Sequence, residues 1–331
     1  MTTSGTAAVE VDLLIIGAGP TGLFATYYAG FRGLSVAVLD SLTELGGQLT
    51  ALYPEKLIYD VGGLPEIRGQ ALVDNLVQQA ASANPTYLLG HRAEELEVAE
   101  DHVVVRTEPG GPVVQAKAVL IAGGIGTFTP RALPDAAAYE GRGLRYFVPK
   151  LDELAGKDVL IVGGGDSAMD WAASLEPIAR SITLIHRRTE FRAHEGTVAR
   201  VLSSSVKVLT PFEVAAIHGT DRVESVDIFN NKTDEHQTLE VQEVVAALGF
   251  TADLGPFTRW GLEQLKRHIV VDSAMRTSLP RVFSAGDITE YDGKVRLISV
   301  GLGEAATAVN NATAVVHPGA KVFPGHSSEV P

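Results

Sequence analysis

Two glycine-rich turns, far apart in the chain, hold the residue types best suited to binding a phosphate-bearing ligand. In order, they read Gly17-Ala18-Gly19-Pro20-Thr21-Gly22 and Gly163-Gly164-Gly165-Asp166-Ser167-Ala168. Each follows a short apolar run and precedes an amphipathic segment, which is the context of a dinucleotide-binding turn. There the first glycine permits the tight turn, the second admits a pyrophosphate, and the third (or an alanine) packs the helix closely on its strand. Backbone N–H groups at the helix start then face the phosphates.

The two copies differ where the second strand of each unit ends. Laid on one another, they place Asp40 opposite His186, which is followed by Arg187 and Arg188 and soon after by Arg192. A carboxylate at this point accepts hydrogen bonds from a free ribose, whereas guanidinium groups hold a 2′-phosphate. The sequence therefore predicts two different dinucleotides on one chain, of which the second is phosphorylated.

Each of these features also has an interpretation without a ligand. A glycine turn can simply join a strand to a helix, Asp166 and Ser167 can serve as helix caps, and an arginine cluster can be ordinary solvated surface. The completeness of the first fingerprint and the place of the arginines directly after a strand favour binding in both copies.

The elements that must position these turns follow from apolar periodicity. Strands are predicted at residues 11–16, 35–39, 103–107 and 117–122, and helices at 21–32, 69–83 and 301–316. This pattern predicts an α/β fold with two Rossmann-like, three-layer dinucleotide-binding domains. The second unit interrupts the first. We therefore expect a discontinuous domain from residues 1–123 and 283–331, and an inserted domain from residues 124–282.

The composition excludes several classes of function. The net charge of −13 disfavours nucleic acid and anionic membranes as partners, and no apolar run is long enough to span a bilayer. The chain has no cysteine, which excludes thiol–disulfide chemistry, iron–sulfur ligation and thiolate zinc sites. The nine histidines show no ligand-like spacing, so we expect no metal site. A cytoplasmic protein is the expectation.

Taken together, the two units resemble the low-molecular-weight thioredoxin reductase superfamily over nearly the whole chain. Residues 185–193, which contain Arg187, Arg188 and Arg192, look very like the NADPH loop of that superfamily. Thioredoxin reductases carry a CxxC pair shortly before the second glycine motif. The corresponding residues 145–150 contain no cysteine here, so the disulfide-reducing branch is excluded by its chemistry.

The branch that the chain resembles most is that of the thioredoxin-reductase-like ferredoxin–NADP(+) reductases. The resemblance is carried by residues 45–56, 58–61, 163–168 and the tail 324–328. It implies FAD on the first motif and NADP(H) on the second. It also implies a homodimer, in which the tail of one subunit crosses to the flavin of the other.

The resemblance further implies cofactor contacts for residues outside the two turns. Gln48 and Tyr53 would contact the isoalloxazine, Tyr53 by stacking on one face, and His326 with Ser327 would lie on the other face. Asp287 would bind the ribityl and pyrophosphate region, while Ala93 and Phe128 would line the cofactor cleft. In full, the implied contacts outside the turns are Gly47, Gln48, Tyr53, Ala93, Phe128, Asp287, His326 and Ser327.

The implied function is electron transfer between NADPH and ferredoxin or flavodoxin through FAD, with hydride passing to flavin N5 and electrons leaving singly. No side chain need act as acid or base, because the cofactors carry the chemistry. Two alternatives stay open: reduction of quinones, oxygen or another small oxidant, and a flavin redox sensor without turnover, which the intact second motif disfavours. Ferredoxins and flavodoxins are acidic, so they require a basic docking patch on a chain of net charge −13. The candidates are the basic residues that cluster in sequence: Arg131, Arg142, Arg145, Lys150 and Lys157.

Overall fold

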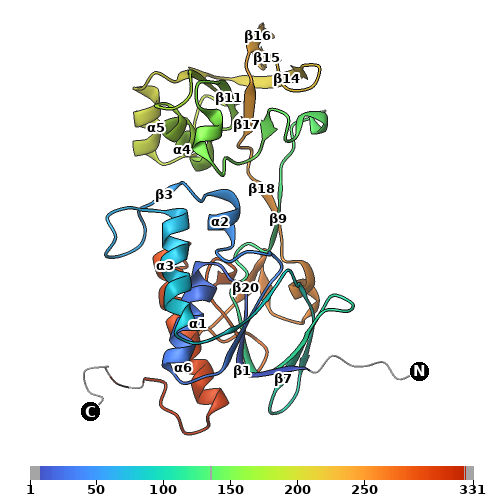
Figure 1. Cartoon of the computed structure of the whole chain (residues 1–331), viewed down its shortest axis with the longest axis vertical. Helices are drawn as coiled ribbons and strands as arrows, with labels where there is room; N and C mark the ends of the chain where they lie inside the picture. The colour runs from blue at the N-terminus through green and yellow to red at the C-terminus, as the bar shows by residue number, and fades with distance from the viewer. Residues whose placement is uncertain (1–7, 135, 324, 326–331) are drawn as a thin grey trace. The chain divides into compact units, whose positions relative to one another are not determined.

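The computed structural model describes residues 8–134, 136–323 and 325, and these fall into two compact units (Figure 1). Unit 1 takes the described residues of Met1–Ala51, Leu57–Thr127 and Ala252–Pro331, and unit 2 takes those of Leu52–Lys56 and Phe128–Thr251. The longest segment of unit 2 therefore interrupts unit 1 in sequence. Each unit is built around its own sheet, mixed but mostly parallel in unit 1 and parallel in unit 2, as expected for an α/β fold of two dinucleotide-binding domains.

The chain returns to unit 1 at Ala252, whereas the sequence analysis placed this return at residue 283. The intervening segment packs into the core of unit 1 through Phe257 and Trp260, whose rings meet edge to face at 4.8 Å. The Trp260 indole N–H also donates to the backbone oxygen of Glu94, at 3.0 Å. This segment has only short strands and no clear periodicity, so its sequence carries little signal for the boundary.

The sheet of unit 1 has the strand order β5-β2-β1-β8-β7-β6, and β21 also pairs with β8. The strands are β1 (Val9–Ile16), β2 (Val36–Asp40), β5 (Thr86–Leu89), β6 (Ala93–Val98), β7 (Val103–Thr107), β8 (Val113–Ile121) and β21 (Val282–Ser284). β5, β2, β1, β8 and β21 run parallel, while β8, β7 and β6 form an antiparallel meander. The glycine turn thus follows the central strand β1 at its carboxyl end, where α/β folds bind ligands.

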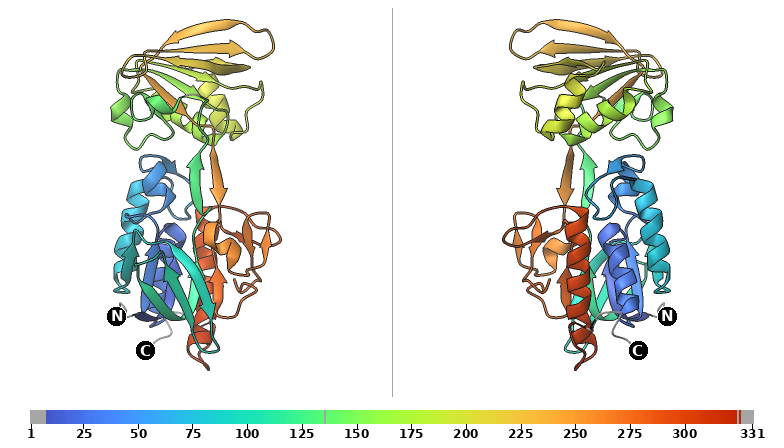
Figure 2. Two further views of the ribbon diagram at one scale, coloured as in Figure 1. Left: turned by 90° about the vertical axis from the view of Figure 1, so that its right-hand side faces the viewer. Right: turned by 90° about the vertical axis from the view of Figure 1, so that its left-hand side faces the viewer.

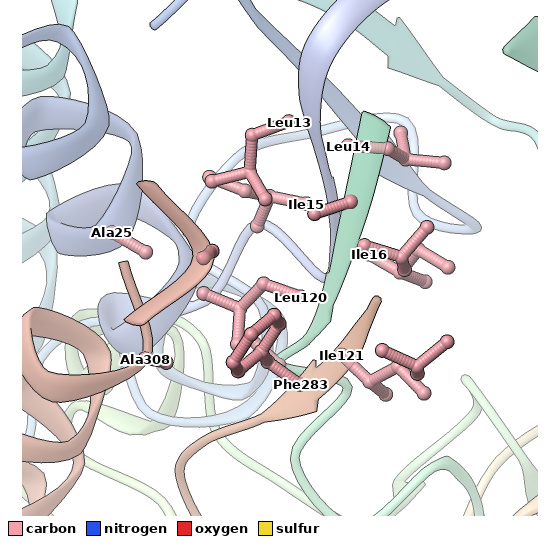
Figure 3. Close-up of a cluster of buried hydrophobic side chains, with 14 of the residues drawn as sticks. Leu13, Leu14, Ile15, Ile16, Ala25, Leu120, Ile121, Phe283 and Ala308 are labelled. Carbon is pink, nitrogen blue, oxygen red and sulfur yellow. The ribbon is translucent and has the colours of Figure 1, made fainter. Parts of the chain in front are cut away.

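The helices of unit 1 are α1 (Pro20–Phe31), α2 (Gln48–Leu52), α3 (Gly69–Ala81) and α6 (Ile298–Val316). α3 packs against α1 in a small core of its own. α1 and α6 lie side by side and cover one face of the sheet (Figure 2). Figure 3 shows Leu13 and Ile15 turned toward these helices, and Leu14 and Ile16 turned to the opposite side. The second half of β1, Leu13–Ile16, is therefore buried on both faces, which explains why all four of its residues are apolar.

Unit 2 is a three-layer arrangement around a parallel sheet of order β10-β17-β11-β12-β13. Its strands are β10 (Leu144–Arg145), β11 (Asp158–Val162), β12 (Ser181–Ile185), β13 (Lys207–Leu209) and β17 (Glu243–Ala246). Val159 and Ile161 pack in one core with the helices α4 (Asp166–Leu175) and α5 (Glu195–Leu202). Leu160 and Val162 pack in another core with the meander, which comprises β14 (Phe212–His218), β15 (Ser225–Asn230) and β16 (His236–Glu240).

Short elements complete the fold. They are β3 (Leu57–Ile58), β4 (Ile67–Arg68), β9 (Thr127–Pro130), β18 (Phe250–Asp253), β19 (Gln264–Leu265), β20 (His268–Val270) and β22 (Thr289–Glu290), with 3-10 turns at Ala137–Tyr139, Leu151–Leu154 and Gly255–Arg259. Among the residues that the structure describes, no helix combines the length and apolar character needed to cross a membrane. No group of three or more acidic, histidine or cysteine side chains arranged to hold a metal ion occurs in the described ranges.

Candidate cofactor sites

Two glycines of the first turn have no space for a side chain, and the glycine between them does. Gly17 has φ of +110°, and a Cβ there would overlap the carbonyl oxygen of Ala122. A Cβ on Gly22 would overlap the carbonyl oxygen of Gly17. In contrast, a Cβ on Gly19 would meet no described atom within 4 Å. Gly17 and Gly22 are therefore required by the fold, whereas Gly19 borders free space of the kind that a pyrophosphate needs.

The start of α1 adds an unneutralised helix end to this turn. Gly19 is the N-cap, no side chain caps the helix, and Pro20 at the first position has no N–H to satisfy. No acidic residue occupies the first turn. The positive end of the helix dipole thus faces the free space beside Gly19, an arrangement that favours an anionic group.

The loop that carries Gly47 and Gln48, two implied cofactor contacts, lies against this turn. The N–H of Gly46 donates to the carbonyl oxygen of Ala18 at 2.9 Å, and a Cβ on Gly47 would lie 3.0 Å from the Cα of Gly19. The Nε2 atom of Gln48 is 3.1 Å from the position that a Cβ of Gly124 would take. The structure therefore brings Gly19, Gly47 and Gln48 together, as expected for residues that contact one cofactor.

Asp40 ends β2 next to the turn and is held by two backbone groups. Its Oδ2 accepts from the N–H of Ala18 at 2.6 Å, and its Oδ1 accepts from the N–H of Leu42 at 2.8 Å. Burial raises the pKa of Asp40, and these two hydrogen bonds partly oppose that rise. A carboxylate oxygen has two lone pairs, so each oxygen retains one for a ribose hydroxyl.

Asp287 lies at the same end of unit 1. It follows Gly286 in the turn after β21, and a Cβ on Gly286 would lie 2.9 Å from Oγ1 of Thr21 in the first turn of α1. Burial raises the pKa of Asp287, while the positive charges of Lys294 and Arg296 lower it. Ala93 is 4% exposed and belongs to the core of unit 1, so its side chain also serves packing.

The second glycine turn repeats the same geometry in unit 2. A Cβ on Gly163 would overlap the carbonyl oxygen of Ala247, whereas a Cβ on Gly165 would meet no described atom within 4 Å. Gly165 is the N-cap of α4, and Asp166 is the first residue of that helix. The Asp166 carboxylate accepts from the N–H of His194 at 2.8 Å. Asp166 thus ties the turn to the loop that carries the arginines.

The arginines of this loop stand free of carboxylates. Arg187, Arg188 and Arg192 are exposed, and none makes an ion pair with an acidic side chain among the described residues. The backbone N–H of Arg192 donates to the carbonyl oxygen of Gly164 at 2.8 Å, which anchors the loop beside the turn. Three unpaired guanidinium groups near a helix start are suited to a phosphate monoester.

His186 is a residue of this site whose role the sequence did not reveal. Its ring stacks on Phe191 at 5.6 Å, and a Cβ on Gly164 would lie 2.5 Å from the imidazole. Its Nε2 is buried and has no hydrogen-bond partner in the part of the chain that is described. Burial, and then the charges of Arg187, Arg188 and Arg192, lower the pKa of His186. A buried polar atom without a partner beside three free cations fits a bound ligand.

Tyr53 and Ser167 meet within unit 2. The Tyr53 hydroxyl is 3.3 Å from Oγ of Ser167, and its ring stacks on Trp171 with centroids 6.0 Å apart. Lys56 of the same short segment pairs with Asp170 at 2.6 Å. The contact of Tyr53 with an isoalloxazine stays a prediction. His326 and Ser327 lie outside the described residues, as does the side chain of Phe128, so their roles also stay predictions.

Two of the five basic residues proposed as a docking patch, Arg145 and Lys157, are neutralised by carboxylates. Arg145 and Lys157 donate to the carboxylate of Glu243 at 3.0 and 2.7 Å, and Glu243 is only 1% exposed. Arg145 also pairs with Glu153 at 2.9 Å. These two side chains thus compensate a buried acid, and the interpretation of all five basic residues as one free patch is wrong.

Comparisons with known proteins agree with this geometry. The model of the pyridine nucleotide-disulphide oxidoreductase family matches residues 11–312. The ferredoxin–NADP reductase of Frankia alni is 63% identical over 96% of this chain and 98% of its own, and that of Thermus thermophilus is 51% identical over 98% of each. Among solved structures, thioredoxin reductase of Lactococcus lactis superposes with a TM-score of 0.79 at 26% identity, over 92% of this chain and 99% of its own.

Proposed function

The chain belongs to the pyridine nucleotide-disulphide oxidoreductase family, and from this premise we propose that it is a ferredoxin–NADP(+) reductase. It is an NADP-dependent flavoprotein oxidoreductase that uses FAD and NADP(H). The observation that carries the proposal is near-full-length identity of 63% and 62% to proteins of that name from Frankia alni and Nocardioides. The absence of cysteine from the chain removes the dithiol chemistry of the thioredoxin reductases, with which it shares a fold.

In this proposal, unit 1 holds FAD and the chain's own residues orient it. Gly19 leaves room for the pyrophosphate at the start of α1, and Asp40 binds the adenosine ribose through its free lone pairs. Gln48 and Asp287 lie beside the same turn and hold the rest of the cofactor. When bound, the cofactors supply hydride and one-electron transfer, so no side chain is required to move a proton.

Unit 2 selects the nicotinamide cofactor. Gly165 leaves room for its pyrophosphate, and Arg187, Arg188 and Arg192 bind the 2′-phosphate. His186 directly precedes Arg187, and its buried Nε2 has no hydrogen-bond partner among the described residues. NADP(H), rather than NAD(H), therefore matches the charge of this site.

A competition among acceptors tests the proposed reaction. We expect NADPH-dependent turnover with ferredoxin or flavodoxin to exceed turnover with a quinone or with oxygen at equal concentration by at least tenfold in kcat/KM. The measurement is a steady-state assay of NADPH oxidation with each acceptor in turn. Equal or faster turnover with the quinone would assign the chain to the reductases of small acceptors instead.

A homodimer is part of the proposal, and an exposed apolar patch of unit 1 supports it. The patch comprises Leu57, Tyr59, Leu64, Val295 and Leu297, of which Tyr59 is 62% exposed. Its two loops are joined, because Asp60 accepts from the N–H of Ile298 at 2.9 Å. Clustered apolar side chains on a surface mark an interaction site. A cytoplasmic location is part of the same proposal.

The double variant Tyr59→Lys with Leu297→Lys tests this interface. Two buried positive charges in an apolar contact would be strongly unfavourable, so we expect the dimer to dissociate at micromolar concentration. Size-exclusion chromatography with light scattering reads out the mass. Leu202→Lys is the matched control, because Leu202 is 56% exposed in unit 2. A wild-type monomer, or a double variant that stays dimeric, would contradict the assignment.

A further inference from the structure

A buried ion pair lies between α6 and the loop that precedes it. Glu304 of α6 is 5% exposed and Lys294 is 1% exposed, and the ammonium group donates to Oε1 of the carboxylate. The hydroxyl of Tyr291 donates to the same oxygen at 2.6 Å. Buried charges are costly unless they are paired and hydrogen-bonded, and here the partners satisfy one carboxylate oxygen.

The second oxygen of Glu304 holds a backbone group in the turn after β21. Its Oε2 accepts from the N–H of Gly286 at 2.7 Å. The carbonyl oxygen of Gly286 in turn accepts from the N–H and the hydroxyl of Thr289, at 3.0 and 2.7 Å. Gly286 has φ of +85°, a conformation that favours glycine. Both polar groups of Gly286 are thus fixed, immediately before Asp287.

This turn packs directly on the first glycine motif. Oγ1 of Thr21 lies 2.9 Å from the position of a Cβ on Gly286 and 2.6 Å from that of a Cβ on Gly301. Two small residues therefore let the turn and α6 approach the start of α1 closely. Glu304 is the hydrogen-bonding link between α6 and the turn at this junction.

Ion pairing alone is a weak reason to bury these groups, since an apolar replacement of a buried ion pair is often neutral or stabilising. A fixed orientation is a better-supported use of such a network. Asp287 carries the polar side chain that the network orients.

We propose that Glu304 is a positioning residue for FAD, which acts by holding the Gly286 backbone so that Asp287 keeps its cofactor-binding position. The inference rests on the proposed assignment of FAD to unit 1. Tyr291 and Lys294 support Glu304, and none of the three need touch the cofactor.

Glu304→Gln is the test variant. Glutamine has the same shape, but its NH2 group replaces one carboxylate oxygen, and both of these oxygens accept hydrogen bonds in the structure. We expect the dissociation constant of FAD to rise at least tenfold, measured by titrating FAD into the apoprotein and following flavin fluorescence. Thr307→Val is the matched control. Thr307 lies one turn further along α6, and its hydroxyl donates to Gly303 of the same helix. We expect the affinity of this control to stay within twofold of the wild type.

A double-mutant cycle separates positioning from general stabilisation. If Glu304 acts through Asp287, Glu304→Gln should add little to the loss of FAD affinity caused by Asp287→Asn. Independent losses that add, together with a lower Tm of the apoprotein, would overturn the inference and leave Glu304 a stabilising residue. If Glu304→Gln does not fold, Tyr291→Phe replaces it, and unchanged FAD affinity in that variant overturns the inference.

Failure of the inference about Glu304 is distinguishable from failure of the proposed function. A wild-type protein that binds FAD but does not reduce ferredoxin would overturn the proposed reaction, while the effect of Glu304 on FAD affinity would stand. A wild-type apoprotein that does not bind FAD would overturn both.

Discussion

Replacing Arg187 and Arg188 together by alanine is expected to lower kcat/KM for NADPH by at least a hundredfold and to leave kcat/KM for NADH nearly unchanged. Each hydrogen bond to a charged group is worth about 1.5–3 kcal/mol, and about 1.4 kcal/mol corresponds to a factor of ten. The two guanidinium groups pair with no described carboxylate, so their charge is available to the 2′-phosphate. The unmodified enzyme should accordingly prefer NADPH strongly.

Arg200→Ala provides the matched control for this prediction. Arg200 is an exposed arginine of α5 in the same unit but does not follow β12. Its replacement removes one positive charge, half of what the double variant loses, so a general electrostatic effect would appear in this control at about half the size. Steady-state kinetics with NADPH and NADH are the measurement. Equal use of the two coenzymes by the wild type would show that the arginine cluster is ordinary surface.

A valine at the open glycine of each turn should remove one cofactor and spare the other. Gly19 has φ and ψ of −72° and −177°, and Gly165 has −100° and −177°, both of which valine adopts without strain. Their Cβ atoms would enter free space within each unit. We expect Gly19→Val to fold as a colourless apoprotein, with FAD affinity reduced at least a hundredfold. Gly165→Val should stay yellow and lose NADPH binding by a similar factor.

Gly22→Ala tests the contrast between an open and a closed glycine. A Cβ there would overlap the Gly17 carbonyl oxygen, so this variant should lower the Tm of the apoprotein, which Gly19→Val should not. The measurements are flavin content, NADPH titration and thermal unfolding of each apoprotein. A Gly19→Val protein that purifies with its full content of FAD would place the pyrophosphate elsewhere.

The sequence predicted the parts of the site whose signals are local. A glycine turn between a strand and a helix is recognisable within a few residues, and the turns at Gly17 and Gly163 do precede the helices α1 and α4. The middle glycine of the second motif has a local cause as well: Gly164 lacks a side chain because the His186 ring lies against it.

The parts of the fold and the site that the sequence did not predict depend on contacts between residues far apart in sequence. Arg145 and Lys157 suggested a basic patch because they are close in sequence, but their partner Glu243 lies 98 and 86 positions away. Trp260 belongs to the core of unit 1 and donates to the backbone oxygen of Glu94, 166 positions earlier in the chain. This long-range contact is one reason why unit 1 resumes at Ala252 and not at residue 283. The network around Glu304 likewise forms only when α6 packs beside the turn after β21. Local propensity contains none of this information.

Anaerobic titration with reduced coenzyme tests most directly that one chain carries FAD and a separate site for NADP(H). One equivalent of NADPH should bleach the visible absorbance of the flavin, and an equal amount of NADH should bleach it far more slowly. Subsequent addition of oxidised ferredoxin should restore the colour. A flavin that NADPH does not bleach, or that NADPH and NADH bleach at the same rate, would contradict the account.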